Sequence, residues 1–172
     1  MLVQILSAII EQPFYDDLRT RQQLGYVVSS GIKASEETRT LSLIVQSSIA
    51  TAEKLTREIL KFLDFFKQKE LDPLSEMKFN SFVKDILDRK HEPDKVLATE
   101  VTRNWSQISN EKYQFDRMKK EASVLLSLTK EDLLEFWDKY VSRRNENGVR
   151  ILVNEIIPQT GADIVKYFSS QC

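Results

Sequence analysis

The sequence contains few of the residues that metal binding and nucleophilic catalysis require, with one histidine and one cysteine among 172 residues. A single histidine, His91, excludes a zinc site with two histidine ligands, and no glycine-flanked serine lies near it to form a serine triad. Because His91 lies in a charged segment, we expect it to be exposed. The cysteine, Cys172, cannot form an internal disulfide, which is compatible with a reducing compartment and a cytoplasmic location.

An excess of charge of one sign and long apolar runs are also lacking. Lys and Arg number 25 against 26 Asp and Glu, so no net positive field favours nucleic acid, and we expect no nucleic-acid partner. No run approaches the roughly 20 apolar residues of a membrane-spanning helix, and we expect no membrane partner. The four glycines do not form a phosphate-binding loop. The adjacent carboxylates Asp16-Asp17 and Glu36-Glu37 are expected to be solvated rather than to bind a cation.

The residues that are present indicate an ordered, helix-rich domain spanning 1–172, because 41% are hydrophobic and turn residues are scarce. Apolar residues recur at helical spacing in several segments and alternate in others. We expect helices over about 2–23, 51–69, 73–89, 94–109, 114–127, 129–142 and 161–169. We expect strands over about 25–34, 39–47 and 149–153. The segregation of strands from helices predicts an α+β fold. Three strands make a thin sheet for so many helices, so we expect further strands upstream of Met1 or in a partner.

Several local signals support these boundaries. Asp72-Pro73 has the form of a helix start, a capping acid followed by proline, and Thr129 with Asp132 has the form of a capping box. The aromatic stripes of the helices are expected to lie in the core. One of them belongs to the helix over 94–109 and consists of Leu97, Val101, Trp105 and Ile108.

The junction between the first helix and the first strand carries a candidate site. Arg19 lies near the end of the helix, Gly25 follows as a residue that can adopt a positive φ, and Tyr26 begins the strand. A guanidinium and a phenol are both hydrogen-bond donors that can converge on one oxygen-rich ligand. A structural interpretation competes, in which Arg19 pairs with Asp16 or Glu11 and Tyr26 packs half-buried against the sheet.

Residues 12–28 resemble the last domain of the insulin-degrading-enzyme branch of the pitrilysin-type zinc peptidases. The specific part is Leu-Arg-Thr-x-x-Gln-Leu-Gly-Tyr at residues 18–26. Further matches in order and spacing lie at residues 44–47, 105, 113–117 and 128–132. The resemblance implies a helix-rich pitrilysin-like α+β fold with a small antiparallel-containing sheet packed by about seven helices. It also implies that the N-terminal strands of that fold are missing here, which predicts an exposed sheet edge prone to pairing.

The same resemblance implies a function that the residues alone do not indicate. This chain would be the substrate-binding, non-catalytic domain of a longer zinc endopeptidase, with Arg19 and Tyr26 contacting the peptide substrate. It would hold no cofactor itself and be inactive alone, because the zinc expected in the full-length enzyme would be bound by the N-terminal catalytic half. Peptide substrates and that half are the implied partners, together with a possible homodimer. The alternative is a catalytically inactive structural relative, such as a processing-peptidase partner or a respiratory-complex core-like subunit.

Overall fold

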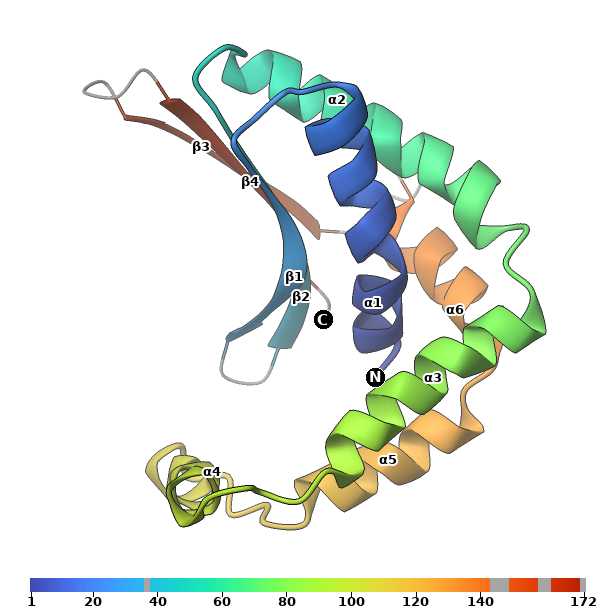
Figure 1. Cartoon of the computed structure of the whole chain (residues 1–172), viewed down its shortest axis with the longest axis vertical. Helices are drawn as coiled ribbons and strands as arrows, with labels where there is room; N and C mark the ends of the chain where they lie inside the picture. Colours follow the sequence, from blue (N-terminus) through green and yellow to red (C-terminus); the bar gives the residue numbers. More distant parts are fainter. Residues whose placement is uncertain (36–37, 143–148, 158–161, 171–172) are drawn as a thin grey trace.

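The computed structural model of the chain describes residues 1–35, 38–142, 149–157 and 162–170, with side chains placed for 1–34 and 38–142 (Figure 1). Within these residues there are six α-helices: α1 (Leu2–Tyr15), α2 (Ala52–Phe66), α3 (Glu76–His91), α4 (Leu97–Ser109), α5 (Arg117–Ser127) and α6 (Lys130–Phe136). Three of them continue into wider π-helical turns: η1 (Asp16–Arg21), η2 (Lys67–Leu71) and η3 (Trp137–Val141). The strands are β1 (Val27–Ser35), β2 (Thr38–Ser47), β3 (Val149–Ile157) and β4 (Ala162–Ser170).

The four strands form one antiparallel sheet in the order β1-β2-β4-β3. The small antiparallel sheet and the α+β class are therefore confirmed. The helix predicted over 161–169 is wrong, because β4 occupies this range and pairs with both β2 and β3. This segment is rich in β-branched and aromatic residues, and such residues favour a strand once partners are available on both sides. Among the described strands, β1 and β3 are the edges of the sheet.

Helix α1 packs on one face of the β1–β2 hairpin, helices α2, α3 and α6 pack against α1, and α5 packs against α3 (Figure 1). Alternate residues of β2 explain this arrangement, because Leu41, Leu43 and Val45 are buried beneath the helix. Four aromatic rings continue the core away from the sheet. Their centroids lie 5.2 Å apart between Phe14 and Phe62, 5.7 Å between Phe62 and Phe66, and 5.4 Å between Phe66 and Trp137. This row of rings ties α1 to α2 and α2 to η3.

The start of α3 differs from the sequence prediction. The helix begins at Glu76, where the Ser75 hydroxyl accepts a hydrogen bond from the Lys78 N–H at 3.3 Å. Asp72 instead closes the preceding element, because its N–H donates to the Lys67 carbonyl at 2.8 Å. The sequence pattern predicted that Asp72 caps the start of the next helix, but in the structure Asp72 ends η2. The capping box of α6 is confirmed, with Thr129 and Asp132 bonding reciprocally.

The apolar stripe of α4 is the clearest departure from the expected core. No residue of α4 is buried, and Leu97 and Trp105 expose 75% and 64% of their surface. The prediction that this stripe lies in the core is therefore wrong. Helical spacing of apolar residues shows which face of a helix seeks burial, but it does not show that the same chain covers that face. In Figure 1, α4 lies apart from the other helices at one end of the molecule.

One carboxylate joins β2, α3 and α5. Glu121 accepts hydrogen bonds from Arg39 and from Arg117 at 2.8 Å each, and from Lys90 at 2.5 Å. Burial of Glu121 opposes its ionisation, but the hydrogen bonds from Lys90 and Arg117 outweigh this effect and lower its pKa. Arg117 therefore takes part in this cluster, whereas its neighbours Lys119 and Lys120 are exposed.

We expect Glu121→Gln to lower the free energy of unfolding by about 2 kcal/mol at pH 7, because three cations lose their shared carboxylate. The pKa of Glu121 is lower in the folded than in the unfolded chain, so its contribution is full above the ordinary value of 4.5 and is lost as the pH falls through the depressed pKa. Denaturant unfolding at pH 7 and at pH 3 measures this. The difference between the parent and Glu121→Gln should shrink at pH 3, whereas the exposed-site control Glu135→Gln should match the parent at both pH values.

Candidate functional site

The junction between η1 and β1 is a sharply folded loop that lies against β2. The Leu24 N–H donates to the Leu18 carbonyl at 2.9 Å, and Leu18 and Leu24 are both buried. The Tyr26 N–H then donates to the Gln46 carbonyl at 2.9 Å, which brings the chain into register with β2. These bonds place the end of η1 and the start of β1 side by side.

The expected role of Gly25 is corrected by this geometry. The residue with positive φ is Gln23, at 52°, and not Gly25. Gly25 is required for space, because a Cβ at this position would lie 2.4 Å from the Gln46 carbonyl oxygen. The close approach of the loop to β2 therefore depends on the absence of a side chain at residue 25.

The structure brings the two candidate residues together. The Arg19 Nη1 donates to the Gly25 carbonyl at 2.5 Å, and the Arg19 Cζ lies 5.2 Å from the centre of the Tyr26 ring. This cation–π arrangement leaves the phenol 83% exposed. The competing interpretation fails in both parts, because the Arg19 hydrogen bond goes to a backbone carbonyl and Tyr26 is not half-buried. The bond to Gly25 uses one of the five N–H donors of the guanidinium.

Arg19 and Tyr26 line a surface hollow of about 540 Å³. Its walls come from the end of α1, from η1, from the loop before β1, and from the end of β2 and the segment after it. They consist of Tyr15, Arg19, Thr20, Gln23, Gly25, Tyr26, Ser47, Ser48 and Ile49. Arg19 is the sole formally charged residue in this lining, and several of the others carry hydroxyl groups. A hollow with one cation, hydroxyl donors and no carboxylate suits a carbonyl or carboxylate oxygen.

Sequence reasoning missed the contribution of residues 47–49 to this hollow. The signal for them was present in the hairpin, because antiparallel pairing of Val27 with Gln46 places the end of β2 beside the start of β1. The register of the hairpin alone is therefore enough to predict that residues 47–49 lie beside the start of β1. The π-helical turn of η1 is a weaker indication of a functional site, since α2 and α6 end in π-helical turns as well.

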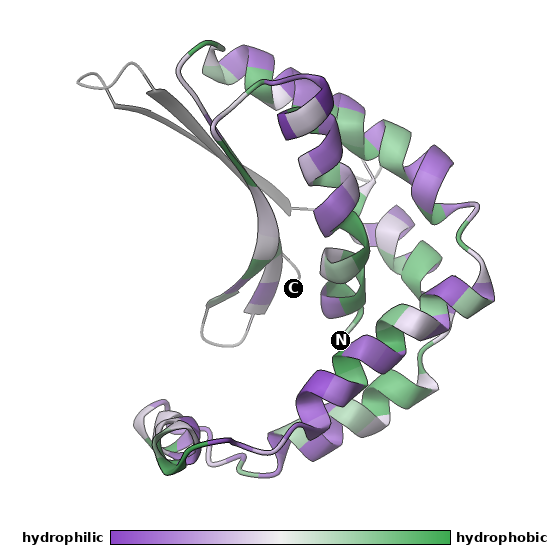
Figure 2. Ribbon diagram, viewed as in Figure 1, coloured by the Kyte–Doolittle hydropathy of each residue, from purple (hydrophilic) through white to green (hydrophobic). Residues whose placement is uncertain are grey.

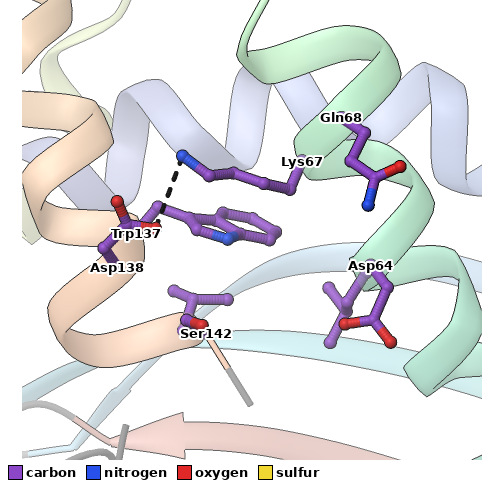
Figure 3. Close-up of a pocket in the computed structure, with 8 residues that line it drawn as sticks. Asp64, Lys67, Gln68, Trp137, Asp138 and Ser142 are labelled. Carbon is purple, nitrogen blue, oxygen red and sulfur yellow. Dashed lines mark ion pairs between the residues drawn. The ribbon is translucent and has the colours of Figure 1, made fainter. Parts of the chain in front are cut away.

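A second hollow of about 500 Å³ lies between the end of α2 and η3 (Figure 3). The Lys67 side chain crosses this hollow above Trp137. Its Nζ lies 3.4 Å from a carboxylate oxygen of Asp138 and 2.9 Å from a carboxylate oxygen of Asp72. Because its ammonium is already paired with two carboxylates, Lys67 links η2 to η3 and is not available as a cation for an anionic ligand. The hollow containing Arg19 is the better candidate.

The other candidate groups are accounted for locally. Asp16 accepts a hydrogen bond from Gln12 at 2.8 Å, and the buried Asp17 forms an ion pair with Arg21. Asp16 and Asp17 were expected to be solvated, but both have partners within the protein. Glu36 and Glu37 lie outside the described residues, as does Cys172, and His91 is exposed as predicted. Within the described ranges, no group of His, Cys, Asp and Glu side chains is arranged to hold a metal ion. No helix in the described part of the chain is long and apolar enough to cross a membrane.

Comparison with known proteins identifies the relatives of this fold. Residues 5–105, more than half of the chain, match the family described as PQQ synthase PqqF-like, C-terminal lobe domain 4. The chain belongs to this family. It is 29% identical over 160 residues to the insulin-degrading enzyme of Homo sapiens, covering 91% of this chain and 16% of that protein. It is 33% identical over 138 residues to nardilysin of Pongo abelii, covering 79% of this chain and 12% of that protein.

The fold of these PqqF-like domains is also that of a solved relative. The crystal structure of pitrilysin superposes with a TM-score of 0.70 at 21% identity, covering 78% of this chain and 14% of that one. The relation to the insulysin and pitrilysin metallopeptidases that residues 18–26 predicted is therefore confirmed. This chain corresponds to about one-sixth or less of the length of each of these relatives.

Proposed function

We propose that this chain is the substrate-binding C-terminal domain of a zinc metalloendopeptidase, and that Arg19 and Tyr26 donate hydrogen bonds to a bound peptide. The observation that supports this most is the pairing of a cation and an exposed phenol on one acid-free hollow. Membership of the insulysin and pitrilysin family supplies the reaction class. The proposal extends to a cytoplasmic site of action.

The geometry suits the stabilisation of negative charge that develops on a peptide oxygen. The Gly25 carbonyl holds the Arg19 side chain in place before any ligand binds, so little reorganisation accompanies binding. The guanidinium of Arg19 brings a positive charge to the peptide oxygen, and the phenol of Tyr26 can donate a hydrogen bond without carrying a charge. Both donors reach their full effect where water is excluded, which requires that another part of the enzyme closes over this hollow.

In this proposal, the zinc is bound by another part of a longer protein and not by this domain. The described residues of this chain do not supply a ligand set for it, so no step of the chemistry is assigned to a metal here. In the proposed enzyme, the catalytic N-terminal half holds the zinc, and this domain positions the peptide against it.

We expect Arg19→Ala in the full-length protein to lower kcat/KM for peptide hydrolysis about 100-fold, and Tyr26→Phe to lower it about 10-fold or more. Arg21→Ala is the matched control, because Arg21 belongs to the same π-helical turn, pairs with Asp17 and does not line the hollow. Turnover of a fluorogenic peptide measures the effect, and thermal unfolding followed by circular dichroism checks that each variant is folded.

The same experiment separates the two functional readings. Unchanged turnover in both Arg19→Ala and Tyr26→Phe would remove these residues from the mechanism. A parent protein that is folded but hydrolyses no peptide would instead identify a catalytically inactive structural relative.

A further inference from the structure

A third hollow lies where α1, α2 and α3 meet, and it has a volume of about 650 Å³. This volume falls within the range of roughly 300 to 1,000 Å³ that is typical of small-molecule sites. Figure 2 shows that each of the three helices carries both hydrophobic and hydrophilic residues. The third hollow shares no lining residue with the hollow that contains Arg19, so it is a separate feature of the molecule.

Aromatic side chains from α2 and α3 form part of the wall of the third hollow. Phe62 and Phe65 of α2 and Phe82 of α3 all line it. Phe62 belongs to the buried row of rings, which fixes its position, whereas Phe65 is 43% exposed and Phe82 is half-buried. Flat apolar rings that are held in place and partly exposed suit the stacking of another ring against them. The wall therefore favours a ligand with an aromatic body.

The charged residues of the same lining carry an excess of negative charge. The carboxylates are Asp16, Asp17 and Glu70, and the cations are Arg21 and Lys78. Asp17 forms an ion pair with Arg21, which cancels one charge of each sign. Asp16 accepts its hydrogen bond from an uncharged amide, so the negative charge of Asp16 is not neutralised by that bond. Two carboxylates then remain against Lys78, and the third hollow favours a cation.

Glu70 is the carboxylate of this lining that gains most from a cationic ligand. It is half-buried, and in the described part of the chain neither an ion pair nor a hydrogen bond joins its side chain to another residue. Lys78 lines the same hollow but is exposed and forms no ion pair with Glu70 in this structure. A carboxylate that is partly removed from water beside apolar rings is stabilised by an opposite charge that a ligand brings.

The backbone of α1 supplies a further acceptor. Pro13 lies inside this helix and has no N–H, so it cannot donate to the carbonyl of Ile9 four residues earlier. Ile9 and Pro13 both line the third hollow, and this carbonyl can accept a hydrogen bond from a ligand. A primary ammonium has three N–H donors, which match the carboxylates of Asp16 and Glu70 and the carbonyl of Ile9.

We propose that the third hollow binds a small primary amine with an aromatic body. The ammonium group pairs with Glu70 and Asp16, and the ring of the ligand packs against Phe65 and Phe82. Because this site shares no lining residue with the hollow that contains Arg19, it does not depend on the proposed peptidase role.

Saturation-transfer difference NMR on the full-length protein at pH 7 tests the ligand class, with phenethylamine as the probe. We expect a dissociation constant of about 1 mM, as is reasonable for a ligand of this size. The neutral 2-phenylethanol and the anionic 3-phenylpropionate carry the same ring, and each should bind about 5-fold more weakly or less well still, because neither supplies the cation. Equal binding of the three probes, or no saturation transfer to phenethylamine at about 10 mM, overturns the proposal.

Substitutions of opposite expected sign test the location. Glu70→Gln should weaken phenethylamine binding about 5-fold or more, whereas Lys78→Gln should strengthen it about 2-fold because a competing cation is removed. Glu135→Gln is the matched control, since it makes the same change of charge at an exposed residue outside the hollow and should bind like the parent. Thermal unfolding followed by circular dichroism checks the fold of each variant. Parent-like affinity in Glu70→Gln overturns the proposal, and if that variant is unfolded, parent-like affinity in Lys78→Gln does so.

Discussion

Replacement of Phe66 by alanine is expected to lower the free energy of unfolding by about 3 to 5 kcal/mol. Phe66 is fully buried at the end of α2, and its ring lies between those of Phe62 and Trp137. Removal of the ring leaves a cavity where α2 meets η3, and the neighbouring aromatic side chains are too rigid to fill it. Domains are commonly stable by only about 5 to 15 kcal/mol, so this one substitution brings the chain close to unfolding.

The neighbouring residue supplies a matched control for this result. Phe65 precedes Phe66 in α2 but is 43% exposed, so Phe65→Ala removes the same atoms from a largely solvated position. We expect it to cost less than about 1.5 kcal/mol, including its contact with the Arg21 guanidinium. Denaturant titration followed by circular dichroism measures both variants. Equal losses for the two would contradict the view that the row of aromatic rings holds α2 against η3.

The sequence was sufficient for those parts of the fold whose signals are local. Alternation in residues 25–34 and 39–47 predicted two strands, and the structure has strands at Val27–Ser35 and Thr38–Ser47 that pair as a hairpin. The same is true of the capping box at Thr129, where side chain and backbone within one turn satisfy each other. The proximity of Arg19 and Tyr26 also follows from local geometry, because a tight loop joins the helix to the strand.

The elements that were predicted wrongly depend on distant partners. Residues 161–169 have an apolar pattern that a helix or a strand can use, and pairing with β3 and with β2, which lies more than a hundred residues earlier, decides for β4. The stripe of α4 has the spacing of a buried face, but periodicity carries no information about what covers it. At Asp72-Pro73 two local signals compete, and continuation of the preceding helix through η2 wins over the start of a new one.

Gly25→Ala is expected to lower the free energy of unfolding by about 3 kcal/mol and to disturb the site at the same time. The added Cβ would meet the Gln46 carbonyl oxygen at 2.4 Å, and this oxygen cannot turn away because it accepts the hydrogen bond from the Tyr26 N–H. The loop must therefore move off β2. The Gly25 carbonyl that holds Arg19 moves with it, so both donors of the proposed site lose their positions.

Gly31→Ala separates this steric effect from the general effect of replacing a glycine. Gly31 lies in β1, where an added Cβ has no heavy atom within 4 Å, so alanine there should be neutral or stabilising by up to about 1 kcal/mol. Denaturant titration compares the stability of the two variants. Peptide turnover in the full-length protein should fall for Gly25→Ala and not for Gly31→Ala. Equal behaviour of the two glycine variants would show that close approach to Gln46 does not position the loop. A Gly25→Ala variant that is destabilised but keeps full turnover would detach Arg19 and Tyr26 from substrate binding while leaving the packing argument intact.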